Sequence, residues 1–101
     1  MTVRATNIVH GNTSCSWETP TEFIYAYRAL IPANNAISQR YTSVGKILNI
    51  DFALQDSNTG CITLYFDSMT SYNEYKGDSN NSFITILTDA GWSREETVEE
   101  L

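Results

Sequence analysis

The feature that most constrains the fold is a pair of alternating segments joined by a short polar loop. Between Val44 and Gln55, and again between Cys61 and Asp67, apolar residues fall on every second position. These apolar residues are Leu48, Ile50, Phe52, Leu54, Ile62, Leu64 and Phe66. A period of two is typical of strands with one buried face. Residues 56–60 are turn formers, so the pattern predicts an antiparallel hairpin whose apolar side chains form one wall of the core.

A helix is predicted to begin at Thr19. The sequence TPTE from Thr19 to Glu22 is a capping box, in which the threonine hydroxyl and the glutamate carboxylate each accept a free backbone N–H. Phe23, Tyr27 and Leu30 then follow at the spacing of one helical face. Residues 33–41 follow Pro32, which disfavours a helical backbone at the residue before it. They are either a second helical piece or a kinked continuation of the first.

Four other segments complete the predicted order of elements. Residues 2–10 are rich in β-branched side chains and predict a first strand, while Asp67 and Ser68 can cap a short helix. Residues 83–88, FITILT, have the composition of a strand; their apolar spacing would suit a helix nearly as well, and we predict a strand. Residues 93–96, SREE, form a second capping box, which predicts a short acidic helix to Leu101.

This order places the chain in the α+β class as a single domain over residues 1–101. Strand, helix, two strands, helix and strand in succession predict a ferredoxin-like fold. We expect a four-stranded antiparallel sheet with two helices on one face and a short C-terminal helix. A chain of 101 residues is long enough to bury one core without disulfides or a metal.

The end of the second hairpin strand carries a resemblance to a known group. The sequence Phe66-Asp67-Ser68, with Tyr72, Tyr75, Lys76 and Asp78 in the helix that follows, resembles the dimeric α/β-barrel group that includes antibiotic-biosynthesis-monooxygenase-like proteins. The resemblance implies two subunits packed sheet to sheet and, in some members, a pocket between sheet and helices for an aromatic substrate or haem. The chain departs from this pattern in the polar outer face of its hairpin and in the absence of an evident catalytic group.

Composition excludes several classes of partner. The formal net charge is -6 with only six Lys or Arg, which disfavours nucleic acid as a partner. No apolar run is long enough to cross a membrane. Cys15 and Cys61 are too few for a disulfide framework and, without a signal peptide, we expect them reduced in the cytoplasm. His10 is the only histidine, so we predict no metal site and no bound cofactor.

Four residues are candidates for a ligand site or an interface, and none is predicted to be catalytic. They are His10, Asp51, Tyr65 and Tyr75. For His10 a solvent-exposed strand end is the favoured interpretation, and for Asp51, which could pair with Asp67, a hydrated sheet face. Tyr65 and Tyr75 suit an interface because their rings are both apolar and hydrogen-bonding.

Three hypotheses about function remain. The first is a non-enzymatic protein-protein interaction domain that binds itself or another protein. The high share of Ser, Thr and Asn suggests a virus-encoded accessory or virion protein, placed in the host cytoplasm. The second is a monooxygenase-like enzyme acting on an aromatic compound, with His10 and Tyr65 near an apolar pocket. The third is an acidic inhibitor that mimics nucleic acid.

Overall fold

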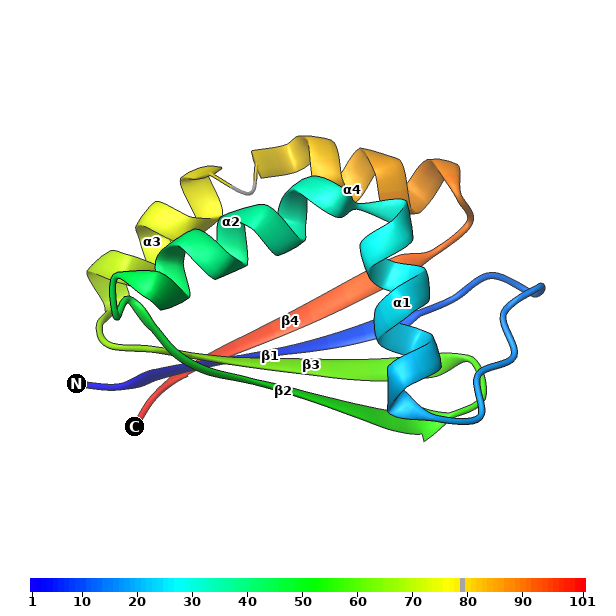
Figure 1. Ribbon diagram of the computed structural model, residues 1–101, viewed down its shortest axis with the longest axis horizontal. Coiled ribbons are helices and arrows are strands. Elements are labelled where there is room, and N and C mark those ends of the chain that lie inside the picture. Colours follow the sequence, from blue (N-terminus) through cyan, green and yellow to red (C-terminus); the bar gives the residue numbers. More distant parts are fainter. Residues whose placement is uncertain (79) are drawn as a thin grey trace.

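The computed structural model shows four helices on one face of a four-stranded antiparallel sheet (Figure 1). It describes the backbone of residues 1–78 and 80–101 and the side chains of 1–78 and 84–101. The elements in order are β1 (Val3–His10), α1 (Pro20–Leu30), α2 (Pro32–Ser43), β2 (Ile47–Asp56), β3 (Thr59–Phe66), α3 (Met69–Asp78), α4 (Asn80–Asp89) and β4 (Ser93–Glu100). The strand order β2-β3-β1-β4 confirms the predicted ferredoxin-like fold. Of the two alternatives for residues 33–41, the structure has the second helical piece, α2.

The first strand, β1, is an inner strand of the sheet, and it pairs along its whole length with both β3 and β4. Its residues alternate strictly between buried and half-buried positions. Val3, Ala5, Asn7 and Val9 point toward the helices, as the period of two requires. Three of these side chains are apolar and fill the core. The fourth, Asn7, is only 3% exposed.

The predicted hairpin is confirmed, with two corrections at its ends. The register shifts between Ile47 and Asn49, so Leu48 is the extra residue of a bulge and lies 54% exposed, while Ile47 takes the core position. The prediction that Leu48 belongs to the core wall is therefore wrong. The connecting loop is also shorter than expected, because Asp56 pairs directly with Thr59 and leaves a two-residue turn.

The capping box at Thr19 is confirmed. The hydroxyl of Thr19 accepts a hydrogen bond from the backbone N–H of Glu22 at 3.2 Å, and the Glu22 carboxylate accepts one from the backbone of Glu18. At Ile31 the backbone leaves the helical region, and Pro32 begins α2 as a separate helix. The bend lets the two helices cover different parts of the sheet (Figure 1).

Two predictions near the C-terminus are wrong. Residues 83–88 belong to α4 rather than to a strand, and residues 93–100 form β4 rather than a helix. In α4 the one described side chain that reaches the core is Leu87, which is 1% exposed. Gly91 ends this turn of the chain at a φ of 80°, a conformation that glycine adopts without strain. Residues 93–100 pair with β1 over its whole length, and this pairing outweighs their local helical preference.

Two groups of aromatic rings fill the two ends of the layer between sheet and helices. Trp17, Phe23, Tyr27 and Trp92, here called the tryptophan cluster, have neighbouring ring centroids 5.0–6.5 Å apart. Tyr41, Phe66, Tyr72 and Tyr75, the tyrosine cluster, have neighbouring centroids 5.4–5.5 Å apart. Gly60 lies under the first cluster, where a Cβ atom would stand 2.4 Å from the Phe23 ring.

Candidate active site

A cavity of about 290 Å³ lies between the two aromatic clusters. Its floor is the helix-covered face of all four strands, and its walls come from α1, α2 and α3. Tyr27 of the tryptophan cluster and Tyr75 of the tyrosine cluster are both part of the lining. The clusters therefore close the two ends of a space that the middle of the sheet leaves open.

One row of four paired residues crosses the floor from strand to strand. Phe52 of β2 pairs with Ile62 of β3, Ile62 pairs with Asn7 of β1, and Asn7 pairs with Glu96 of β4. All four line the cavity. Side chains directly opposite each other in an antiparallel sheet lie about 5 Å apart. The floor therefore changes within one row from a hydrocarbon surface on β2 and β3 to a polar one on β1 and β4.

The amide of Asn7 is the most unusual group in this row. It is buried, and its Oδ1 atom has no hydrogen-bond partner among the described residues. A buried polar atom without a partner costs about 1–3 kcal/mol. Most native proteins avoid that cost, and because Asn7 also lines the cavity, its side-chain amide is a candidate contact for a ligand.

The hydroxyl of Tyr75, on the α3 wall, has two hydrogen-bond partners. Asn34 donates its Nδ2–H to this oxygen at 3.1 Å, and Ser38 shares a hydrogen bond with it at 3.1 Å. Both partners come from α2, so the three side chains join α2 to α3 above the floor. This network fixes the position of the Tyr75 ring beside the cavity.

Two tyrosines around the site have a raised pKa. Burial raises the pKa of Tyr27, while the charge of Arg94 and its hydrogen bond to the phenol partly oppose that shift. Burial also raises the pKa of Tyr72, and the hydrogen bond that its hydroxyl donates to the Glu96 carboxylate adds to the effect. Both phenols are protonated at neutral pH; Tyr72 donates a hydrogen bond to Glu96, while the Tyr27 oxygen accepts one from Arg94.

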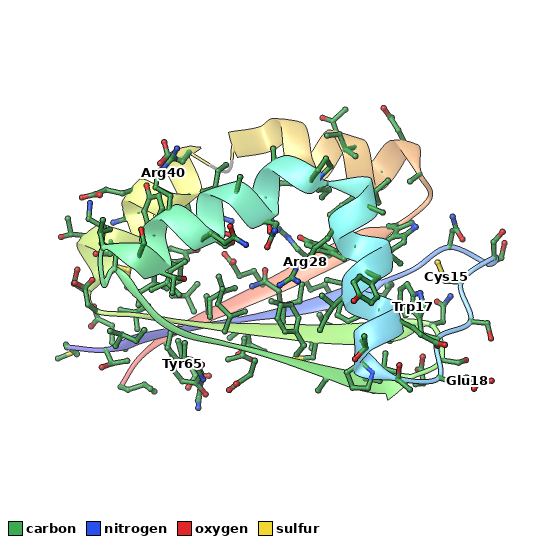
Figure 2. All side chains as sticks on the ribbon, in the orientation of Figure 1. Cys15, Trp17, Glu18, Arg28, Arg40 and Tyr65 are labelled. Carbon is green, nitrogen blue, oxygen red and sulfur yellow. The ribbon has the colours of Figure 1, made fainter. Side chains whose placement is uncertain are left out.

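The four residues singled out from the sequence fall on both faces of the sheet. Tyr75 lines the cavity. His10, Asp51 and Tyr65 lie on the face that no helix covers, and the Tyr65 side chain points away from the helices (Figure 2). The expectation that His10 and Tyr65 lie near the pocket is therefore not met. The role of these three residues at an interface stays a prediction.

The described residues offer no gathered set of metal ligands, since no group of three or more His, Cys, Asp or Glu side chains comes together there. Cys15 and Cys61 are both free thiols. In the described part of the chain no helix is long and apolar enough to cross a membrane.

Comparison with known proteins identifies the fold group. No protein-family profile and no curated protein matches the chain. Among solved structures, SnoaB, a cofactor-independent oxygenase from Streptomyces nogalater, is 10% identical, with 99% of this chain and 92% of SnoaB covered and a TM-score of 0.64. A protein from Deinococcus radiodurans, provisionally assigned as an antibiotic biosynthesis monooxygenase, is 14% identical with 98% and 91% covered and a TM-score of 0.66. A dimeric ferredoxin-like protein from an uncultured marine organism is 11% identical with 100% and 90% covered and a TM-score of 0.57.

These neighbours confirm the resemblance to the antibiotic-biosynthesis-monooxygenase-like, ferredoxin-like group at the level of the fold. They also correct the first functional hypothesis. The interpretation as a non-enzymatic, virus-encoded interaction domain is contradicted, because the neighbours include an oxygenase and proteins provisionally assigned as monooxygenases, and the chain has the cavity that the enzyme hypothesis requires. No contact or comparison bears on the acidic mimic of nucleic acid.

The sequence contained one usable signal for the site. Asn7 is the polar member of the otherwise apolar side of β1, formed with Val3, Ala5 and Val9. A polar residue on an inward-facing side needs a partner, and that need could have identified it. Arg94 and Glu96 lie in the SREE sequence, which predicts a helix start, so the sequence does not indicate that they belong to a strand on the cavity floor. Nothing in the local sequence distinguishes Arg28.

Proposed function

We propose that this protein is an oxygenase that binds a small aromatic molecule in the cavity between its sheet and its helices. The observation that carries the proposal is the buried, unpartnered amide of Asn7 on the floor of that cavity. Cavities of this size with apolar walls and a few polar groups are the usual form of small-molecule sites. The fold shared with a cofactor-independent oxygenase supports the same conclusion.

The wall residues suggest how such a substrate would be held. An aromatic ring would lie against Ile62 and Leu64 of β3, beside Phe52, over whose ring the Arg28 guanidinium lies. A hydroxyl group on that ring would donate a hydrogen bond to Oδ1 of Asn7 and so remove the cost of the unpartnered oxygen. Binding energy would then depend on the substrate carrying a donor at one position, which gives orientation as well as affinity.

Glu96 is the one carboxylate among the described wall residues, and we assign it the role of proton acceptor. It lies beside Asn7 in the same row of the floor. Removal of a proton from the substrate makes the ring electron-rich enough to reduce O₂ directly. In this scheme a phenol is converted to a quinone. One atom of O₂ becomes the new carbonyl oxygen on a ring carbon, and the other leaves as water with the hydrogens lost from that carbon and from the hydroxyl. The substrate thus supplies all four electrons, and the protein contributes orientation and the proton transfer.

The test is oxygen consumption by the purified protein with a panel of hydroxylated polycyclic aromatics, with products identified by mass spectrometry. We expect uptake of O₂ that depends on the substrate and is unchanged by EDTA. The Asn7→Leu variant should lose activity by about tenfold or more, because a hydrogen bond that orients the substrate is gone. Asn73→Leu, at an exposed position on α3, is the matched control and should keep full activity. Equal activity of both variants, or no uptake with any compound, would contradict the proposal.

We also propose that two copies of the chain pair through the uncovered face of the sheet. One of the fold neighbours is a dimeric ferredoxin-like protein, which supports the idea. On this face Ile8, Cys61 and Tyr65 are half-buried even in the single chain and offer an apolar centre. Light scattering coupled to size exclusion should give a dimer for the parent and a monomer for Tyr65→Glu. A monomeric parent would overturn this proposal and leave the cavity proposal intact.

A further inference from the structure

The charge of the cavity wall is opposite to that of the whole chain. The lining holds Arg28, Lys76 and Arg94 against a single carboxylate, Glu96, a formal charge of +2. The chain as a whole has a net charge of -6. Half of its six basic side chains therefore surround one small cavity, and the local potential favours an anion there.

The basic residues also differ in how they are paired. Four of the six have a carboxylate partner: Arg4 with Glu99 at 3.1 Å, Arg40 with Asp78 at 3.2 Å, Lys76 with Glu96 at 3.2 Å, and Lys46 with Glu74. The two that remain are Arg28 and Arg94, which have no carboxylate partner among the described residues. Both of them line the cavity. Arg94 hydrogen-bonds the neutral Tyr27 phenol, which leaves its charge uncompensated. In a chain with twice as many acidic as basic residues, two arginines without a carboxylate partner at one site indicate that a ligand provides the negative charge.

The two arginines lie on opposite sides of the apolar floor. The Arg28 guanidinium extends from α1 toward the sheet (Figure 2) and lies over the ring of Phe52, 5.4 Å from its centroid. Arg94 lies on β4, at the other edge of the sheet, paired with Val9 and two residues before Glu96. The two guanidiniums therefore bring positive charge to the cavity from different elements. Stacking on Phe52 holds Arg28 in position without neutralising its charge.

We infer that the substrate class of this cavity is an aromatic carboxylate, with Arg28 and Arg94 selecting for its negative charge. This inference rests on the proposed function, because it names the substrate of the same cavity. A guanidinium matches a carboxylate with two parallel hydrogen bonds, and such charge-assisted bonds are about twice as strong as neutral ones. The apolar floor takes the ring, and Asn7 takes a hydroxyl group on that ring.

The experiment compares two probes of nearly the same shape, 2-naphthoate and 2-naphthamide, by isothermal titration calorimetry. We expect the parent protein to bind the charged probe at least tenfold more tightly than the neutral one. Arg28→Gln and Arg94→Gln should each weaken naphthoate binding by about tenfold to a hundredfold and leave naphthamide binding within about twofold. Arg40→Gln is the control, because it removes the same charge from an ion pair outside the cavity. Thermal denaturation of each variant checks that it is folded.

The outcomes separate this inference from the proposed function. Equal binding of both probes, with no effect of either arginine, overturns the inference and leaves an aromatic-binding cavity. An equal effect of Arg40→Gln also overturns it, since the preference would then come from overall charge. Failure of both probes to bind counts against the inference and the proposed function together. Selective naphthoate binding without O₂ uptake from any substrate supports the inference while contradicting the oxygenase.

Discussion

The tryptophan cluster and the tyrosine cluster close the two ends of the same cavity with different chemistry. At one end Trp17 and Phe23 pack as hydrocarbon, with Gly60 beneath them leaving no room for a side chain. At the other end the tyrosine hydroxyls are tied to polar groups on α2, α3 and β4. One end is therefore held by shape and the other by hydrogen bonds. The two ends should respond to different mutations, the first to loss of volume and the second to loss of a hydroxyl.

The largest expected effect on stability comes from removing one ring of the tryptophan cluster. Phe23 is 0% exposed and contacts both Trp17 and Tyr27, so Phe23→Ala should lower the free energy of unfolding by about 3–5 kcal/mol. Phe52→Ala is the matched change in the half-buried cavity floor and should cost less than half as much, because part of that ring already faces open space. Urea denaturation measures both. Equal costs would mean that the cavity is as tightly packed as the cluster.

The next effect concerns the hydrogen bonds of the tyrosine cluster. Tyr75→Phe removes the oxygen that Asn34 and Ser38 share, and Ser38 is itself buried. A buried polar group that loses its partner costs about 1–3 kcal/mol, which urea denaturation should detect. Tyr25→Phe, at a position 69% exposed, is the control and should change little. An unchanged free energy of unfolding for Tyr75→Phe would show that water replaces the hydroxyl and that this end is held by packing.

A smaller effect of opposite sign is expected on the floor between the clusters. Asn7→Leu replaces an unpartnered amide with an apolar side chain of similar size, so it should raise the free energy of unfolding by about 1 kcal/mol. The same change should slow oxidation of the substrate by about tenfold or more. A gain in stability with a loss of activity would identify Asn7 as a residue kept for function. A loss of stability would instead show that the amide has a partner in the free protein.

The last effect is a dependence of stability on alkaline pH, which Tyr41 of the tyrosine cluster should show. Burial and the hydrogen bond to Asp78 raise the pKa of Tyr41 to about 12, from about 10 in the unfolded chain. Between these values the folded state holds a proton that the unfolded state has lost, so stability is full below pH 10 and falls as pH rises toward 12. Tyr41→Phe should therefore lose less stability across this window than the parent. Denaturation at pH 9, 10.5 and 12 tests this, and identical slopes would contradict it.

The parts of the fold that the sequence predicts are those with short-range causes. The helix start at Thr19 depends on atoms within four residues, and it was predicted correctly. The hairpin depends on a local alternation and a local turn. The bulge at Leu48 and the strand at residues 93–100 depend on partners distant in the sequence, Phe66 and Tyr65 for the first and β1 for the second. Local preference favours the wrong answer at both places.

The site is less predictable than the fold for the same reason. Its floor joins Phe52, Ile62, Asn7 and Glu96 from four strands, and this row exists only once the order β2-β3-β1-β4 is known. The sequence indicates Tyr75 as a candidate for a ligand site or an interface because its ring is amphipathic, and the structure places it on the cavity wall. Arg28 and Arg94 are notable because neither has a carboxylate partner among the described residues. A sequence does not show which basic residues form ion pairs and which do not.

The tryptophan cluster gives the protein a built-in optical reporter. Both tryptophans of the chain are in it, 5.3 Å apart between ring centroids, and Trp92 lies 6.5 Å from Tyr27 on the cavity wall. Emission excited at wavelengths that only indole absorbs therefore comes from one end of the molecule. Three of the six tyrosines are in the tyrosine cluster, so tyrosine absorbance at high pH includes a signal from the other end. Following one denaturation by both signals would show, without any label, whether the two ends separate from the sheet together or one after the other.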